Sequence, residues 1–141
     1  LHYELFAQRS ENPFRNYIQR EITGLGLRYL INDHARFGLA FINEDEEDLN
    51  KINTKTERLS LYFHDDFEIG ENIFFNTTIY VQPSVDDFSD DVKSSAIFAL
   101  DFEVNEQVTI SLQYSRFNDN APPMNADKMD ESISTKFSWS F

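Results

Sequence analysis

The last ten residues of the chain constrain its fold most strongly, because apolar and small polar side chains alternate there without interruption. Residues 133, 135, 137, 139 and 141 are Ile, Thr, Phe, Trp and Phe, and the residues between them are Ser or Lys. Successive side chains of a β-strand point to opposite faces of a sheet. The segment 132–141 is therefore predicted to be a strand with one apolar face and one polar face.

The same alternation recurs in seven earlier segments, which predicts eight strands in all. They cover residues 1–8, 24–31, 36–41, 59–64, 73–82, 95–104, 107–115 and 132–141. Aromatic residues make up 15% of the chain, with only four Gly and four Pro, and aromatic side chains favour strands. No run of 18 apolar residues is present, so we expect no transmembrane helix.

The links between these segments alternate between short and long. Residues 32–34, 70–72 and 105–106 are short polar turns, whereas residues 9–16, 43–55, 83–91 and 118–130 form longer links. An up-and-down barrel of the outer membrane has short periplasmic turns and longer extracellular loops. The sequence therefore predicts an all-β fold: an antiparallel transmembrane β-barrel of eight strands, one domain over residues 1–141, with a periplasmic C-terminus.

A water-soluble barrel with an apolar interior is the alternative interpretation of alternating strands. The polar faces carry more Ser, Thr, Gln and Asn than Lys and Glu, and the apolar faces end in aromatic residues. Both features are typical of a bacterial outer-membrane barrel with aromatic girdles. We expect Leu112, Tyr114, Phe137 and Trp139 to face lipid. We expect the lumen to be lined by Arg28, Asp101, Glu103, Ser111, Gln113, Ser134 and Lys136.

Several segments resemble the bacterial family called domain of unknown function 481, whose members are often labelled salt-induced outer-membrane proteins. The resemblance is carried by residues 15–33 (RNYIQREITGLGLRYLIND), 57–62 (ERLSLY), 80–89 (YVQPSVDDFS) and the final SWSF. It implies an outer-membrane location and transfers no catalytic residue, because the family has no established activity. Its members usually carry further alternating segments upstream, so the chain resembles either the C-terminal part of a barrel of 10–12 strands or a short eight-stranded relative.

The terminal Phe141 resembles the signal by which the barrel assembly machinery recognises its substrates. Other expected partners are outer-membrane lipid, lipopolysaccharide or a membrane-protein complex. The net charge of −13 argues against nucleic acid as a partner.

Two acidic runs in the long links are candidates for weak binding of divalent cations, since carboxylates are hard ligands. The residues concerned are Glu44, Asp45, Glu46, Asp86 and Asp87. The simpler interpretation is a solvated outer rim, and the spacing is not that of a dedicated calcium loop. We expect no cofactor.

The inner faces carry charges of both signs, which favours a salt-bridged plug over an open pore. The residues assigned to this plug are Arg20, Arg28, Arg36, Lys136, Glu4, Glu21, Asp101 and Glu103. An eight-stranded barrel is only wide enough for side chains. A narrow channel for ions or small solutes becomes the alternative if further strands widen the lumen.

The strongest catalytic candidate is the run His64-Asp65-Asp66. Strand alternation places His64 and Asp66 on the inner face, Asp65 on the opposite face, and the group near the periplasmic end. His2 and His34 are expected at the periplasmic rim and not to complete a triad with His64. The chain has no Cys and no Gly-x-Ser-x-Gly motif. We therefore expect a non-enzymatic outer-membrane protein with a structural, envelope-stress or complex-partner role.

Overall fold

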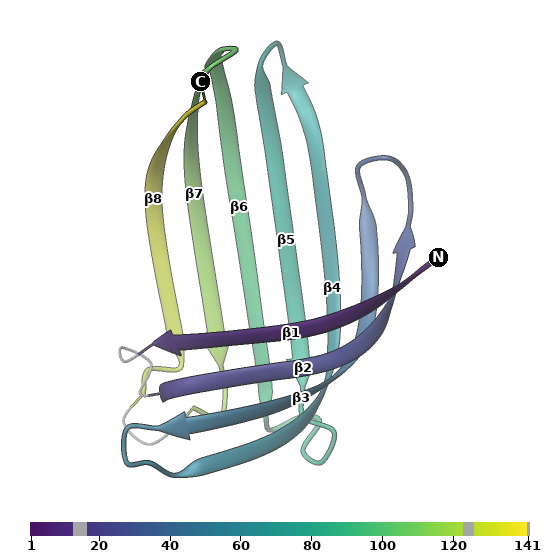
Figure 1. Cartoon of the computed structure of the whole chain (residues 1–141), viewed down its shortest axis with the longest axis vertical. Helices are drawn as coiled ribbons and strands as arrows, with labels where there is room; N and C mark the ends of the chain where they lie inside the picture. The colour runs from purple at the N-terminus through teal and green to yellow at the C-terminus, as the bar shows by residue number, and fades with distance from the viewer. Residues whose placement is uncertain (13–16, 123–125, 141) are drawn as a thin grey trace.

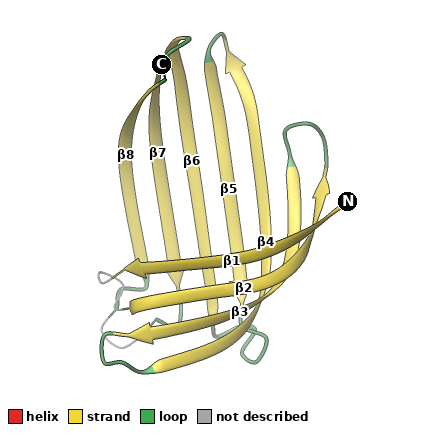
Figure 2. Cartoon of the chain, viewed as in Figure 1, coloured by secondary structure: helices red, strands yellow, loops and turns green. Residues whose placement is uncertain are grey.

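Eight antiparallel strands form one sheet in a computed structural model that describes residues 1–12, 17–122 and 126–140. Each strand pairs with its neighbours in sequence, which confirms the predicted up-and-down topology (Figures 1 and 2). The strands are β1 (His2–Asn12), β2 (Tyr17–Leu30), β3 (Arg36–Asp48), β4 (Asn53–Gly70), β5 (Ile73–Pro83), β6 (Val92–Asn105), β7 (Val108–Asp119) and β8 (Met129–Trp139). Among the described residues, no helix is long and apolar enough to cross a membrane.

The sheet is strongly curled, and it is not closed. Figure 1 shows β1 to β3 lying across β5 to β8, and the Tyr62 hydroxyl of β4 donates a hydrogen bond of 2.8 Å to Glu4 of β1. Within the described residues, β1 and β8 each pair with one neighbour only. The strand order and the curl therefore agree with the predicted barrel. The sheet itself is open and has two free edges, β1 and β8.

Strand β4 produces much of the curl, because it pairs with β3 and β5 over different parts of its length. Its residues 53–64 pair with β3, and its residues 61–70 pair with β5. Only residues 61–64 are shared, so the two halves of the sheet are staggered. A stagger of this kind tilts the strands of a barrel against its axis.

Gly38 allows the curled strands to approach closely. A Cβ atom at Gly38 would overlap the ring of Tyr62, which lies over it from β4. A Cβ atom at Gly26 would come within 2.6 Å of the Cβ atom of Ala40. Glycine on the inner face of β2 and β3 is therefore a condition for this curvature, as is common where a sheet bends sharply.

The three short turns lie where the sequence predicted them. In the first, the Asn32 side-chain oxygen accepts hydrogen bonds from the backbone N–H groups of His34 (2.8 Å) and Ala35 (2.6 Å). In the second, Asn72 adopts a positive φ of 62°, a conformation that Asn tolerates better than most residues. We call the end of the sheet with these turns the turn end, and the opposite end the loop end.

Most strands extend further toward the loop end than predicted, and β2, β3 and β4 extend furthest. The predicted link 43–55 was wrong, because β3 continues to Asp48 and β4 begins at Asn53. Strand β2 likewise begins at Tyr17 instead of residue 24. Backbone pairing continues there although the outward residues have become polar, so apolar alternation underestimates the strand length. Of the links 9–16 and 118–130, residues 13–16 and 123–125 lie outside the described residues.

The strand register separates the residues into an outer face and an inner face, as the alternation predicted. On the outer face Leu112 lies opposite Leu100 and Thr135, and large apolar side chains are exposed, with Leu5 at 89% and Phe137 at 76%. The described buried hydrophobic residues are few, namely Ile22, Ala35, Ala40, Ile42 and Tyr62. The sheet thus exposes apolar side chains and keeps charged ones inside.

Candidate functional site

Seven charged side chains meet on the inner side of the curled sheet near its loop end. We call them the internal charge cluster: Arg20 of β2, Glu44 and Glu46 of β3, Arg58 of β4, Asp91, Lys93 of β6 and Asp119 of β7. Four are almost completely buried, with relative exposures of 2% (Arg58), 3% (Glu44), 5% (Asp119) and 6% (Lys93).

Glu44 is the centre of the cluster and is bound by three cations. One of its carboxylate oxygens accepts hydrogen bonds from Arg20 (2.9 Å) and from Nε of Arg58 (3.0 Å). Its other oxygen accepts a hydrogen bond from the Lys93 ammonium group. A buried carboxylate loses its hydration, and hydrogen-bonded cations on both oxygens offset that loss.

Lys93 extends the network to two further carboxylates. Its Nζ atom lies 3.1 Å from Glu46 and 3.8 Å from Asp119. Lys93 of β6 therefore connects β3, which is distant in the strand order, with the neighbouring strand β7 across the interior. The cluster holds four carboxylates against three cations, so its charges are largely compensated inside the protein.

Arg58 connects the cluster to the link after β5. Its guanidinium group forms a two-point ion pair with Asp91, at 2.9 and 3.0 Å, and donates to the backbone oxygen atoms of Gln82 and Asp91. The backbone N–H groups of Ser84 and Val85 donate to Asp91 and Glu57, both at 2.8 Å. The Gln-Pro-Ser-x-Asp-Asp-Phe stretch thus packs where β4 diverges from β5.

The sequence predicted a mixed-charge plug but only part of its membership. Arg20 was assigned correctly to the inner face, whereas Arg58, Lys93 and Asp119 were missed. Strand alternation could have identified these residues, because side chains two positions apart share a face. Arg58, for example, continues the inner row of Ser60 and Tyr62 in β4. Glu21 was assigned to the interior in error, because its position in the register places it on the outer face opposite Arg9.

The five candidate ligands for divalent cations do not form a metal-binding group among the described residues, although Glu44, Asp45 and Asp86 line one open pocket. Glu44 and Glu46 bind the internal cations, whereas Asp45 points to the outer side and pairs with Lys55 at 3.2 Å. Asp86 and Asp87 lie in the link after β5, and the backbone oxygen of Asp87 caps a turn formed with Asp90 and Asp91. Within residues 1–12, 17–122 and 126–140, no three His, Asp or Glu side chains form a group suited to a metal ion.

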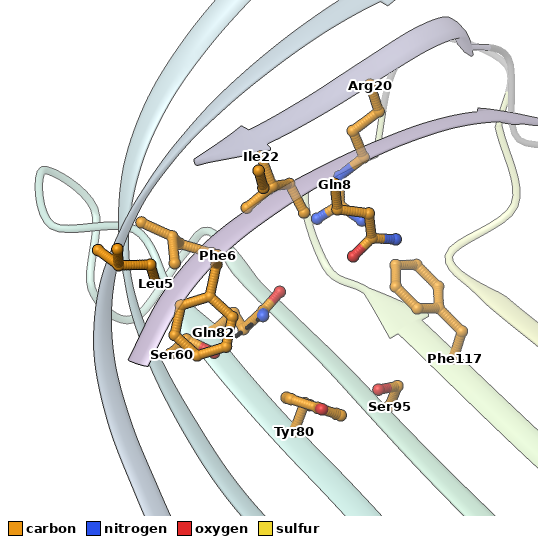
Figure 3. Close-up of a pocket in the computed structure, with 12 residues that line it drawn as sticks. Leu5, Phe6, Gln8, Arg20, Ile22, Ser60, Tyr80, Gln82, Ser95 and Phe117 are labelled. Atoms are coloured by element: carbon orange, nitrogen blue, oxygen red, sulfur yellow. Dashed lines mark hydrogen bonds between the residues drawn. The ribbon is translucent and has the colours of Figure 1, made fainter. Parts of the chain in front are cut away.

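A cavity of about 460 Å³ lies beside the charge cluster, between the two halves of the sheet. Figure 3 shows Phe6 and Gln8 of β1 extending toward the same space as Tyr80 of β5 and Phe117 of β7. Gln82 lies in its wall and donates a 3.0 Å hydrogen bond to Ser60. The cavity therefore combines apolar and neutral polar side chains.

The inner face is more open at the turn end, where His64 and Asp66 lie. His64 contacts the Thr78 hydroxyl (2.8 Å) and the Asp66 carboxylate (3.2 Å). Asp66 also lies 3.7 Å from the ring of His34, and its backbone N–H donates to the His34 oxygen (3.4 Å). The expectation that His2 and His34 complete no triad with His64 stays a prediction. His34 itself lies at the turn end beside Asp66. The contacts between His34 and Asp66 hold the first turn, residues 31–35, against the part of β4 that extends beyond its pairing with β3.

The remaining predicted lumen residues share the inner face with this group. Arg28 pairs with Glu4 at 3.2 Å, Asp101 accepts a 2.7 Å hydrogen bond from Asn76, and Lys136 donates to Gln113 at 3.2 Å. Ser111 lies opposite Lys136, Ser134 lies opposite Gln113, and Glu103 lines a cavity of about 400 Å³ at this end.

The predicted lipid-facing residues lie together on the outer face. Tyr114, Phe137 and Trp139 share this face with Leu112. Ring contacts connect Phe67, Phe75, Phe98 and Tyr114 across β4 to β7, at centroid distances of 5.5, 6.3 and 6.3 Å. The predicted assembly signal, Phe141, lies outside the described residues.

Comparison of the chain with known families gives one match. The family described as "Protein of unknown function, DUF481" matches residues 2–141. The chain belongs to this family. No curated protein and no solved structure matches it. Because the DUF481 match spans all eight strands, the internal charge cluster and the adjoining cavity lie within the family's domain.

Proposed function

We propose that this DUF481 protein is a non-enzymatic β-barrel protein of the bacterial outer membrane, with its turn end and C-terminus in the periplasm. Its role in this proposal is structural, either in envelope integrity under stress or as a partner in a membrane-protein complex. The supporting observation is the inverted polarity of the sheet, which has exposed apolar side chains outside and buried, paired charges inside.

The inverted polarity favours lipid over water around the outer face. Apolar surface in water costs about 25 cal/mol per Å², and the outer face exposes many Leu, Phe and Ile side chains. A soluble barrel of the lipocalin type keeps apolar residues inside. Here Glu44, Arg58 and Lys93 are inside instead, where their mutual ion pairs offset the loss of hydration.

Insertion into a bilayer requires the two free edges to be paired. Unsatisfied backbone groups cost several kcal/mol each in hydrocarbon, and β1 and β8 each pair on one side only among the described residues. In the membrane these edges pair with each other or with further strands, as the expected 10–12-stranded barrel would supply. At the loop end, lipopolysaccharide is the expected neighbour, and the barrel assembly machinery is the expected partner during insertion.

A direct test is partition of the full chain between buffer and phosphatidylcholine vesicles. We expect the refolded chain to float with the vesicles, to show the circular dichroism of a β-sheet and to resist protease in its strands. A monomer that folds in buffer and does not float with the vesicles would contradict the proposal.

A narrow channel is the second candidate, favoured by the open turn end. Apart from Lys136, the inner side chains of β8 there are small, including Ser134 and Ser138, and a cavity of about 400 Å³ lies beside β4 to β7. The internal charge cluster opposes this function, because it fills the interior at the loop end. Stepwise conductance in planar bilayers that is lost after bulky substitution of Ser111 or Ser134 would establish the channel; silent bilayers would favour the structural role.

A further inference from the structure

The cavity beside the internal charge cluster has walls of two kinds (Figure 3). Phe6 of β1, with Ile22 and Ile42, supplies apolar surface from one half of the sheet. Tyr80, Ser95 and other inner residues of β5 to β7 supply hydroxyl and ring surface from the other half. Its volume of about 460 Å³ lies within the range of small-molecule sites.

The charge balance of the cavity favours a neutral occupant. Arg20 is the only lining residue with a formal charge among those described, and its guanidinium group donates to Glu44 at 2.9 Å. A charged ligand would lose its hydration there without gaining a counter-ion, which is costly. A neutral molecule meets no such penalty.

The polar side chains of the cavity suit hydroxyl groups. Gln8 and Gln82 each carry an amide that both donates and accepts hydrogen bonds, and Ser60, Ser95 and Tyr80 carry hydroxyls that do the same. A ligand hydroxyl is itself both donor and acceptor, so it can pair with any of these groups without a fixed charge.

The aromatic rings of the cavity suit a flat apolar face. Phe6 and Phe117 extend into the cavity from opposite halves of the sheet. Tyr80 adds a third ring to the wall, and its centroid lies 5.5 Å from that of the Tyr62 ring. A saturated ring with C–H groups on its faces and hydroxyls on its edge matches both the rings and the neutral polar groups.

We propose that the interior cavity between β1–β2 and β5–β7 binds a neutral hydroxylated ring of the pyranose sugar class. Aromatic side chains contact the C–H face of the ring, and Tyr80 with the Gln and Ser side chains contacts its hydroxyls. The charge cluster adjoins the site toward the loop end, where Arg20 belongs to both. The paired charges fill the interior there, so the site holds a ligand and does not pass it through. This inference depends on the cavity and not on the membrane location.

The experiment is saturation-transfer NMR with maltose as the probe, on the folded full chain in a detergent without a sugar headgroup. We expect transfer to the C–H protons of the sugar ring. Phe117→Ala and Tyr80→Phe should weaken binding, the first by about tenfold. Two matched substitutions on the outer face, Phe137→Ala and Tyr114→Phe, should leave binding unchanged.

Three results would overturn the proposal. The first is no transfer from the folded chain to maltose at millimolar concentration. The second is transfer that persists unchanged in both Phe117→Ala and Tyr80→Phe, because the sugar would then bind elsewhere. The third is displacement of maltose by sodium decanoate, which would assign the cavity to amphipathic anions. Circular dichroism of each variant separates loss of binding from loss of fold.

Discussion

The two ends of the interior differ sharply although both are lined by polar residues. At the loop end, Arg58 and Glu44 are buried and bound to one another. At the turn end, Glu103 and Lys136 on the same inner face are exposed. The difference teaches that side-chain polarity alone does not determine whether an inner residue is part of a plug; the packing around it does.

The stagger of β4 and the link after β5 create this difference. Where β4 diverges from β5, Ser84 pairs with Arg58 as an isolated bridge and becomes buried. The link thus covers the charge cluster. At the turn end, β8 is an edge strand whose inner residues have one neighbouring strand only among the described residues.

The largest expected effect comes from breaking the loop-end plug. Arg58→Met should lower the free energy of unfolding by about 3–5 kcal/mol, because Glu44 and Asp91 would each lose a buried partner. Urea unfolding of the full chain in vesicles measures this. The control is Arg116→Met, which removes an exposed pair with Glu131 and should cost less than about 1 kcal/mol. Equal losses would show that the two sites do not differ.

The second effect tests the assignment of residues to the outer and inner faces of the sheet. Leu112→Arg should cost about 2–4 kcal/mol if this outer residue sits near the bilayer midplane. Ser111→Lys, one residue away, should be far better tolerated, because it faces the inner side, where Asp101 lies directly opposite in β6 and offsets the charge of Lys136 opposite in β8. The same unfolding assay compares them, and a larger cost for Ser111→Lys would refute the assigned faces.

The third effect concerns the curvature that brings the loop-end residues together. Gly38→Ala should destabilise the sheet by about 1–3 kcal/mol, because its Cβ atom overlaps the Tyr62 ring. Gly70→Ala is the matched control, since the nearest atom to its Cβ would be Cδ1 of Ile73 at 3.9 Å. Thermal unfolding should separate the two variants, and no difference would argue against close packing at Gly38.

The smallest effect lies at the turn end. Asn32→Ala removes one acceptor for the backbone N–H groups of His34 and Ala35. Water can replace that acceptor at this exposed turn, so we expect a loss of about 1 kcal/mol. Urea unfolding measures the loss, and a cost comparable to that of Arg58→Met would contradict the open character of this end.

The sequence was sufficient to predict the strands and their faces, because alternation depends on local geometry. Leu112 and Ser111 lie on the predicted faces since a strand has a period of two residues. The charge cluster could be predicted only in part. Arg58, Lys93 and Asp119 come from three strands, and their meeting depends on the stagger of β4, which no single segment encodes.

Strand ends were predicted less well than strand centres for a related reason. Glu44 and Glu46 were assigned to a solvated rim, because apolar alternation stops near residue 43. The structure continues β3 to Asp48 and turns both glutamates inward. Their role as ligands of divalent cations stays a prediction. Both carboxylates already pair with Arg or Lys side chains of the protein, so a metal ion would have to compete with those cations.

The most direct test of the central claim compares two single-tryptophan variants in lipid vesicles. In a Trp139→Phe background, the variants Leu112→Trp and Ser111→Trp place the fluorophore on the outer and inner faces of β7. The account predicts that brominated lipid chains quench emission at position 112 strongly and at position 111 weakly. Equal quenching at both positions, or stronger quenching at position 111, would contradict a sheet whose outer face meets lipid.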